Sequence, residues 1–113
     1  MATSIERGDV YWVEFDPSLG GEIKKTRPAL VLSNNGANTH LNRVQVVPIT
    51  SNIDRLYPGE AFVSLNGEKR KAMADQLTTA SKQRFGRRIA TLSKDDMGKI
   101  EMAVLVQLGI DRS

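Results

Sequence analysis

The chain has 113 residues, a formal net charge of +3 and no cysteine. One domain, residues 1–113, fits this length, and the lack of cysteine excludes a disulfide framework, thiol catalysis and thiolate metal sites. No apolar run approaches the ~20 residues that span a bilayer, and the first residues lack the apolar stretch of a signal peptide, so we expect a cytoplasmic protein without membrane contact.

The positive charge is concentrated in the middle of the chain. Residues 20–88 hold twelve Lys and Arg against five Asp and Glu, whereas residues 1–19 and 89–113 are both net acidic. A basic segment of this kind favours a polyanionic partner.

Aromatic and β-branched residues over 10–15 predict the first β-strand. Alternation along a strand places Val10, Trp12 and Glu14 on one face. We therefore expect Trp12 to belong to the core and not to serve as a platform for a stacked base.

A charged loop with two glycines precedes the second strand, which we expect over residues 28–33. Its charged side chains are Glu22, Lys24, Lys25 and Arg27. Pro28 ends the loop and pushes Arg27 into an extended conformation at the mouth of an apolar strand that should be covered on both faces. A cation held in this way suits a phosphate; the alternative is an ordinary solubilising loop.

Residues 34–40 are predicted to be a turn-rich polar excursion, in which we expect His40 to be solvated, with a general base as the alternative. Residues 44–52 predict the third strand. Pro48 cannot donate to a ladder, so its end of the strand should be an edge or a bulge, from which Thr50 and Ser51 emerge. These two hydroxyls can donate to phosphate oxygens, or they can simply cap the strand.

Residues 60–65 alternate as a half-buried strand, and Asn66-Gly67 after them is the signal of a type I′ hairpin. Residues 72–79 predict the next strand. It carries Asp75 and Gln76, of which Asp75 could act as a base, accept a hydrogen bond from a nucleobase, or pair with an arginine.

The last third of the chain predicts one helical turn over residues 81–85, a strand over 86–92 and an amphipathic helix over 94–108 that ends at Gly109. The apolar face of this helix should consist of Met97, Ile100, Val104, Leu105 and Leu108. Together the elements predict a mainly β fold with a C-terminal α-helix (α+β), built as a small, strongly bent antiparallel sheet or barrel.

The sequence lacks the spacing of a nucleotide-binding glycine loop, of a His or Cys metal motif and of a Ser-His-Asp triad, so we expect no cofactor and no metal. The arginines, lysines, hydroxyls and carboxylates suffice for attack of an RNA 2′-hydroxyl on its own phosphate. The substrate supplies the nucleophile, and the protein must stabilise extra negative charge and manage two protons.

Four motifs in this order resemble the MazF/PemK toxins of bacterial toxin–antitoxin pairs, and the similarity covers essentially the whole chain. They are Arg7-Gly8-Asp9-Val10-Tyr11-Trp12, Gly20-Gly21-Glu22 with Lys25-Thr26-Arg27-Pro28, Val47-Pro48-Ile49-Thr50-Ser51, and Asp75-Gln76. The resemblance implies an SH3-like barrel of the MazF/PemK/CcdB type, a homodimer, and a cognate MazE-like antitoxin whose acidic tail occupies the RNA groove. It also implies metal-independent, sequence-specific cleavage of single-stranded mRNA to 2′,3′-cyclic phosphate and 5′-hydroxyl ends, which arrests growth.

The family's functional positions are carried over as follows. Arg27 and Thr50 match the catalytic arginine and threonine, Glu22 the loop carboxylate, and Ser51, Asp75 and Gln76 the groove residues, with Lys24 and Lys25 as further RNA-binding cations. Arg27 would neutralise the developing phosphorane, Thr50 would orient the phosphate, and either Glu22 or Asp75 would accept the 2′-hydroxyl proton.

Met73 stands where one branch of the family has an arginine that acts as general acid, so the acid is unassigned. The alternative function is a non-catalytic toxin on the same barrel that grips a protein such as a topoisomerase, or a plain RNA-binding module.

Overall fold

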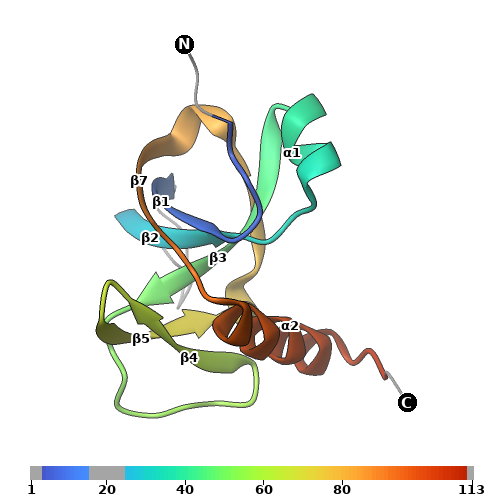
Figure 1. The fold of residues 1–113 in the computed structure, drawn as a ribbon. Coiled ribbons are helices and arrows are strands. Elements are labelled where there is room, and N and C mark those ends of the chain that lie inside the picture. The colour runs from blue at the N-terminus through green and yellow to red at the C-terminus, as the bar shows by residue number, and fades with distance from the viewer. Residues whose placement is uncertain (1–3, 16–24, 112–113) are drawn as a thin grey trace.

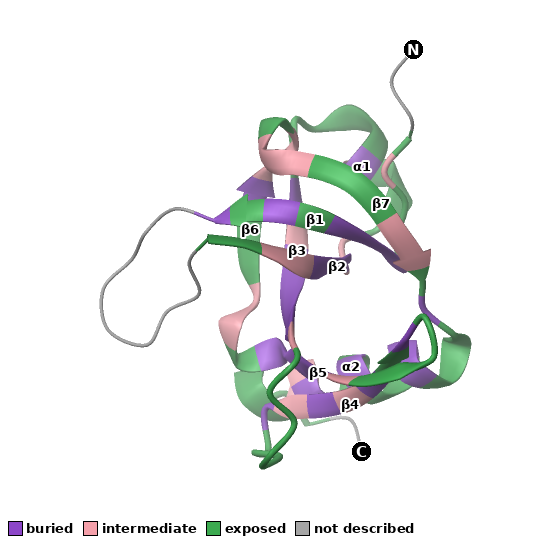
Figure 2. Cartoon of the chain, turned by 90° about the vertical axis from the view of Figure 1, so that its left-hand side faces the viewer, coloured by how far each residue is buried: buried purple, intermediate pink, exposed green. Residues whose placement is uncertain are grey.

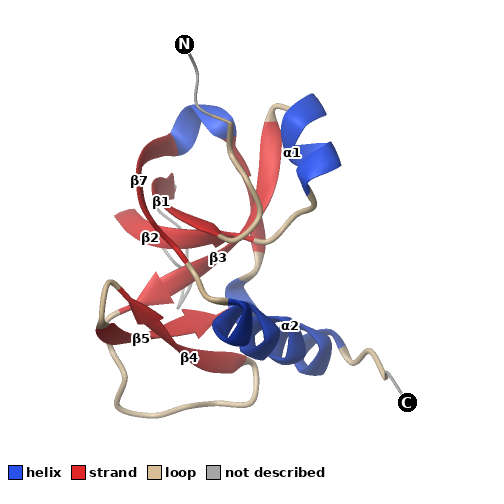
Figure 3. Ribbon diagram, in the orientation of Figure 1, coloured by secondary structure: helices blue, strands red, loops and turns tan. Residues whose placement is uncertain are grey.

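The computed structural model describes residues 4–15 and 25–111, and within them the chain is mainly β with a C-terminal helix (Figures 1 and 3). The strands are β1 (Asp9–Phe15), β2 (Lys25–Val31), β3 (Arg43–Thr50), β4 (Glu60–Leu65), β5 (Glu68–Met73), β6 (Thr78–Ser81) and β7 (Phe85–Thr91). The helices are α1 (Asn35–His40) and α2 (Lys94–Leu108), with short 3₁₀ turns at Ala74–Gln76 and Lys82–Arg84. The predicted fold class is confirmed.

All strand pairs in the sheet are antiparallel, in the order β4-β5-β3-β2-β1-β7, with β6 also beside β3. The sheet bends strongly, so that β4 and β5 lie below the other strands and α2 packs against β4 (Figures 1 and 2). β4 and β7 stand at the two ends of this order and do not pair with each other. The arrangement is a barrel-like sheet that stays open between these strands.

The core lies on both faces of the sheet, because successive side chains of a strand point to opposite faces. One cluster, which includes Leu30, Val47 and Ile49, packs between the bent halves of the sheet and α2. The other includes Val13 and Val31 on the opposite face. In β2, Ala29, Leu30 and Val31 are 0 % exposed, as the apolar composition predicted, whereas Pro28 is half-buried.

Pro48 determines how β3 is paired. On one side β3 pairs with β2, and Pro48 lies opposite Ala29. On the other side, residues 43–46 pair with β6 and residues 49–50 pair with β5. Since proline has no N–H to donate, the ladder on this side breaks at Pro48, so the expected irregularity is present, but β3 is an internal strand and not an edge.

The break corrects the prediction of one continuous strand over residues 72–79. Residues 73–77 face only residues 47 and 48 of β3, and the extra length forms the Ala74–Gln76 3₁₀ turn. The strand is therefore two strands, β5 and β6, with Asp75 and Gln76 in the turn between them.

The polar segment after β2 is a short helix, which corrects the prediction of turns alone. Asn34 caps α1, because its Oδ1 accepts a hydrogen bond from the backbone N–H of Ala37 at 2.8 Å. Asn38 is 1 % exposed and donates to the carbonyl of Ser33 at 2.8 Å. Asn34 and Asn38, which the sequence pattern assigned to turns, thus make the contacts that stabilise this short helix.

Helix α2 has the predicted bounds and most of the predicted face, since Met97 and Ile100 are buried and Val104 packs against the core. Its buried residues are Asp96, Met97, Ile100 and Ala103. Leu108 is 57 % exposed, because the last turn extends beyond the strands that cover the first three. Gly109 ends the helix with φ of 70°, as predicted. No described helix is both long and apolar enough to cross a membrane.

The core assignment predicts a large difference between two leucine truncations. Leu30→Ala removes a side chain that is 0 % exposed and should lower the free energy of unfolding by about 2–5 kcal/mol. Leu41→Ala, at a residue that is 41 % exposed, should cost under about 1 kcal/mol. Urea denaturation of both variants measures the difference, and equal losses would contradict the assignment of Leu30 to the core.

Candidate active site

Arg27 and Thr50 come together because β2 and β3 pair side by side. The ladder joins Leu30 to Val47 and Ala29 to Pro48. Continued by two residues in the same register, it sets Arg27 opposite Thr50, at the ends of the two strands. Both residues line one pocket of ≈ 510 Å³.

This pocket, the Arg27 pocket, has an apolar floor and a polar rim. Its apolar lining consists of Trp12, Pro28, Ile49, Leu65 and Ile89. Its polar lining consists of Lys25, Thr26, Arg27, Thr50, Ser51, Asn66, Glu68 and Arg70. The pocket can therefore take a ligand that is partly flat and apolar and partly anionic, which is the chemistry of a nucleotide.

Trp12 corrects the expectation that it belongs to the core. It is 38 % exposed, whereas its neighbours Tyr11 and Val13 are buried. The alternation was read correctly, but the face shared by Val10 and Trp12 is core at Val10 and opens into the Arg27 pocket at Trp12. The exposed indole gives the pocket a surface on which a base can stack.

The β4–β5 hairpin supplies groups that sequence reasoning missed. The type I′ prediction is confirmed by φ of 51° at Asn66 and 82° at Gly67. The tight turn holds Glu68 and Arg70 at the pocket, where they form an ion pair of 2.9 Å. Among the described residues, Glu68 is the only carboxylate that lines the pocket. Its position depends on the sheet's bend, which the local sequence does not specify.

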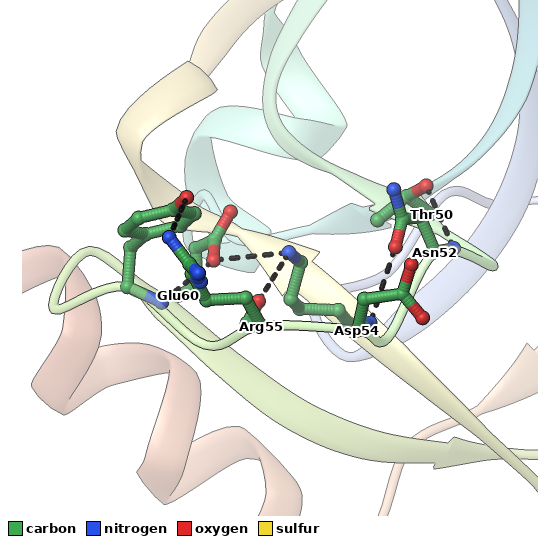
Figure 4. A network of polar contacts seen from close by, with 7 residues as sticks. Thr50, Asn52, Asp54, Arg55 and Glu60 are labelled. Carbon is green, nitrogen blue, oxygen red and sulfur yellow. Dashed lines mark hydrogen bonds and ion pairs between the residues drawn. The ribbon is translucent and has the colours of Figure 1, made fainter.

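The loop after Thr50 is built by short side-chain turns (Figure 4). The hydroxyl oxygen of Thr50 accepts from the N–H of Asn52 at 3.2 Å, and Asn52 Oδ1 accepts from the N–H of Asp54 at 3.1 Å. The capping role considered for Thr50 is thus present in the structure. It leaves the hydroxyl's proton available to donate to a phosphate, because the oxygen acts here only as an acceptor.

A buried ion pair anchors the other end of this loop. Lys71 lies opposite Thr50 in the β3–β5 register, and its Nζ is 3.1 Å from Glu60 Oε1, with both side chains under 10 % exposed. Lys71 also donates to the carbonyl of Arg55 at 2.8 Å, and Glu60 accepts from the N–H of Tyr57 at 2.9 Å (Figure 4). The loop and the end of β3 are therefore tied to β5 and β4.

Two further predicted site residues line the Arg27 pocket, and two lie outside the described residues. Ser51 and Lys25 are both exposed at its rim. Lys25 has a φ of 69°, a left-handed conformation that is unfavourable for a residue with a side chain. Glu22 and Lys24 belong to the segment that the structure does not describe.

Asp75 and Gln76 do not line the Arg27 pocket. The N–H of Asp75 donates to the carbonyl of Gly59 at 3.1 Å, which holds it beside the start of β4. Partial burial raises the pKa of the Asp75 carboxyl above its usual value, and the nearby Glu60 carboxylate raises that pKa further. Asp75 thus has an environment that can tune a proton acceptor, but it is not among the residues that line the pocket with Arg27 and Thr50.

His40 is exposed at the end of α1 and does not line the Arg27 pocket, in keeping with a solvated histidine. Across residues 4–15 and 25–111, no group of three or more His, Cys, Asp and Glu side chains is placed to hold a metal ion.

Comparison with known proteins finds one family and several solved relatives. Residues 6–108 match the family described as PemK-like, MazF-like toxin of type II toxin–antitoxin system. Endoribonuclease MazF9 of Mycobacterium tuberculosis is 33 % identical over 115 residues, which cover 94 % of this chain and 98 % of that protein.

Two solved structures share the fold. MazF of Deinococcus radiodurans has a TM-score of 0.83 and 26 % identity, over 96 % of this chain and 99 % of that one. A MazE–MazF structure from the same organism has a TM-score of 0.76 and 27 % identity, over 96 % of this chain and 100 % of that one.

The buried ion pair of Lys71 and Glu60 predicts that removal of one partner strongly lowers stability and that removal of both partners restores most of it. Lys71→Met leaves the Glu60 carboxylate buried without its partner and should cost about 3–5 kcal/mol. Adding Glu60→Gln should restore most of that loss. Arg70→Met, which breaks an exposed pair, should cost under about 1 kcal/mol. Thermal denaturation compares the three variants, and a Lys71→Met loss no larger than that of Arg70→Met would refute the anchoring role.

Proposed function

This chain belongs to the family of PemK-like, MazF-like toxins of type II toxin–antitoxin systems, and from that premise we propose that it is a metal-independent endoribonuclease. It cleaves single-stranded mRNA at a short sequence by attack of the 2′-hydroxyl on the adjacent phosphate. The products are a 2′,3′-cyclic phosphate and a 5′-hydroxyl, and the loss of mRNA in the cytoplasm arrests growth.

The observation that carries this proposal is the meeting of Arg27 and Thr50 at one pocket beside an exposed tryptophan. A guanidinium stays protonated near neutral pH and binds phosphate oxygens in a bidentate manner. The indole of Trp12 offers a face for a neighbouring base. One pocket therefore offers a phosphate ligand, a hydroxyl donor and a stacking surface, which together suit a single-stranded RNA substrate.

Four residues that line the Arg27 pocket have a proposed part in stabilising charge during the reaction. Arg27 stabilises the negative charge that develops on the phosphorane oxygens, and Thr50 donates its hydroxyl to the same phosphate. Met73 is buried at the end of β5 and has no proton to give. Arg70 and Lys25 supply positive charge at the rim that stabilises the leaving 5′-oxygen, which takes up a proton from water to become the 5′-hydroxyl.

Three carboxyl groups are candidates for the base that accepts the 2′-hydroxyl proton. Glu22 and Asp75 are implied by the family resemblance, and Glu68 is added by its place in the Arg27 pocket. Asp75 lies beside β4, so it can act on the substrate only if the RNA extends to the Ala74–Gln76 turn. Location therefore favours Glu68 over Asp75, whereas Glu22 lies outside the described residues and remains a candidate through the family resemblance alone.

We also propose that a MazE-like antitoxin inhibits this chain. The support is family membership and the basic rim of the Arg27 pocket, which suits an acidic peptide as well as a phosphate chain. Antitoxin and RNA then compete for the same cations, so binding of the antitoxin blocks cleavage.

An exposed apolar face of α2 supports the proposal of a homodimer. Leu56, Met102 and Val106 are 46 %, 62 % and 54 % exposed, and they line one groove of ≈ 400 Å³ together with Pro58 and Phe62. Large exposed apolar patches usually mark an interface. The family resemblance implies a second copy of this chain as the occupant.

The proposed mechanism predicts that Arg27→Ala and Thr50→Ala each lower kcat/KM for RNA cleavage at least about 100-fold, because each removes stabilisation of the transition state. Arg43→Ala and Thr78→Ala are matched controls, since both residues are exposed and neither lines the Arg27 pocket. The assay follows purified protein and single-stranded RNA in EDTA, with circular dichroism to check folding. Cleavage that requires a divalent metal, or growth arrest without shortened RNA, would overturn the proposal.

The same assay identifies the base among Glu22→Gln, Glu68→Gln and Asp75→Asn. A general base accepts a proton only while it is deprotonated, so the cleavage rate falls as the pH drops and the base becomes protonated. Substituting the base abolishes this acidic fall in rate, whereas the other two variants retain it. If Asp75 is the base, the wild-type rate falls at a pH above the usual pKa range of carboxyl groups, because the pKa of Asp75 is raised in the folded chain.

The proposed dimer predicts that charged substitutions in the apolar groove lower the mass of the protein in solution. Met102→Glu with Val106→Glu places two carboxylates in the apolar groove and should convert a dimer into a 12.5 kDa monomer in sedimentation equilibrium. Leu41→Glu, exposed but outside that groove, should leave the dimer intact. A dimer that survives the double substitution would show that another surface forms the interface.

A further inference from the structure

A second pocket lies outside the proposed active site. It has a volume of ≈ 860 Å³, and its lining combines three cations, Lys82, Arg87 and Arg88, with two aromatic residues, Tyr11 and Phe85. We call it the Arg87 pocket. None of the predicted site residues lines it.

The two pockets flank β1 and share the edge strand β7. Trp12 and Tyr11 point to opposite faces of β1, and Trp12 lines the Arg27 pocket whereas Tyr11 lines the Arg87 pocket. From β7, Ile89 lines the first pocket, and Arg87 and Arg88 line the second. Figure 2 shows β7 at the edge of the sheet with a long exposed stretch. The two pockets therefore lie on opposite faces of β1.

Irregular pairing of β7 places its side chains in both pockets. Its register with β1 shifts twice, between the pair formed by Val10 and Ala90 and the pair formed by Tyr11 and Arg88, and again before the pair of Val13 and Phe85. Such bulges on edge strands re-aim side chains and often lie beside functional sites. A regular edge strand would not place Arg87 and Arg88 together on one pocket.

The charge of the Arg87 pocket is not neutralised by its own lining. The Arg87 side chain is exposed and forms no ion pair within the described part of the chain. Arg88 is 56 % exposed at its side chain and lies 3.8 Å from Asp9, a long contact. No Asp or Glu of the described residues lines the pocket. An anionic ligand would therefore find the exposed guanidinium of Arg87 and, beside it, that of Arg88, whose ion pair with Asp9 is long.

The aromatic part of the pocket suits a base. Phe85 is half-buried and packs edge-on to Tyr11, with 5.4 Å between ring centroids and 63° between ring planes. The contact fixes the Phe85 ring beside the two arginines. Cations next to a fixed aromatic ring are the pattern by which proteins hold single-stranded nucleic acid without reading its sequence.

We propose that the Arg87 pocket is a second RNA subsite, which holds nucleotides that flank the cleaved segment of the same strand. Arg87 and Arg88 bind backbone phosphates there, and Phe85 packs against a base. The RNA reaches this subsite from the Arg27 pocket by passing around the edge strand β7. The inference rests on the proposed function, because it assumes that RNA occupies the Arg27 pocket.

The test compares two RNAs, once the cleavage sequence is mapped with the wild-type chain. The short RNA holds only that sequence, and the long RNA adds about eight unpaired nucleotides on each side. Arg87→Ala should raise KM for the long RNA at least about fivefold and leave KM for the short RNA and kcat for both unchanged. The slope of log KM against log salt for the long RNA should fall by about 0.7, the value for one phosphate contact on a single strand.

Two further variants sharpen the test. Phe85→Leu keeps the apolar volume and loses the ring, so it should also raise KM only for the long RNA. Lys94→Ala, at an exposed cation that lines neither pocket, should change nothing.

The outcomes separate the subsite from the proposed function. Wild-type KM equal for both RNAs, or an Arg87→Ala effect equal on both, overturns the subsite and leaves the endoribonuclease proposal standing. If Arg87→Ala weakens only the binding of the antitoxin, the pocket belongs to a protein partner and the RNA subsite is overturned. Absence of cleavage by the wild-type chain overturns the proposed function and the inference with it.

Discussion

The antiparallel register between β2 and β3 is the constraint on which the site depends. It sets Arg27 opposite Thr50 at the ends of two strands whose inner residues are 0–1 % exposed. A slip of this register by one residue would turn every side chain of β2 to the opposite face of the sheet. The residues next to Arg27 would then pack on the wrong face. Core packing around Leu30 and Val47 therefore fixes the position of the two polar groups at the strand ends.

Pro48 and Lys71 extend this constraint to the rest of the pocket. Pro48 breaks the ladder between β6 and β5, and the resulting 3₁₀ turn carries Asp75 and Gln76, which do not line the Arg27 pocket. Lys71, opposite Thr50, neutralises Glu60 and holds the loop that follows Thr50. Part of the basic charge in the middle of the chain is thus structural, and the charge that remains for a polyanion lies on the pocket rims and on β7.

Local sequence patterns were sufficient for most elements, whereas the choice of Arg27 and Thr50 as one site came from the family resemblance. Asn66-Gly67, the bounds of α2 and the buried run of β2 all follow from near neighbours in the chain. Trp12, Glu68 and the break after Met73 do not, because their surroundings are set by the bend of the sheet and by a proline on another strand. The expected chemistry came from the family resemblance. Only the structure shows that Asp75 does not line the Arg27 pocket.

The central claim is that Arg27 and Thr50 act on one phosphate, and a double-mutant cycle on kcat/KM for RNA cleavage tests it most directly. Residues that stabilise one transition state together are strongly non-additive. We predict that the variant with both Arg27→Ala and Thr50→Ala cleaves RNA no more slowly than the slower single variant, within about threefold. If the two losses multiply, the residues act independently and the account of a shared phosphate is wrong.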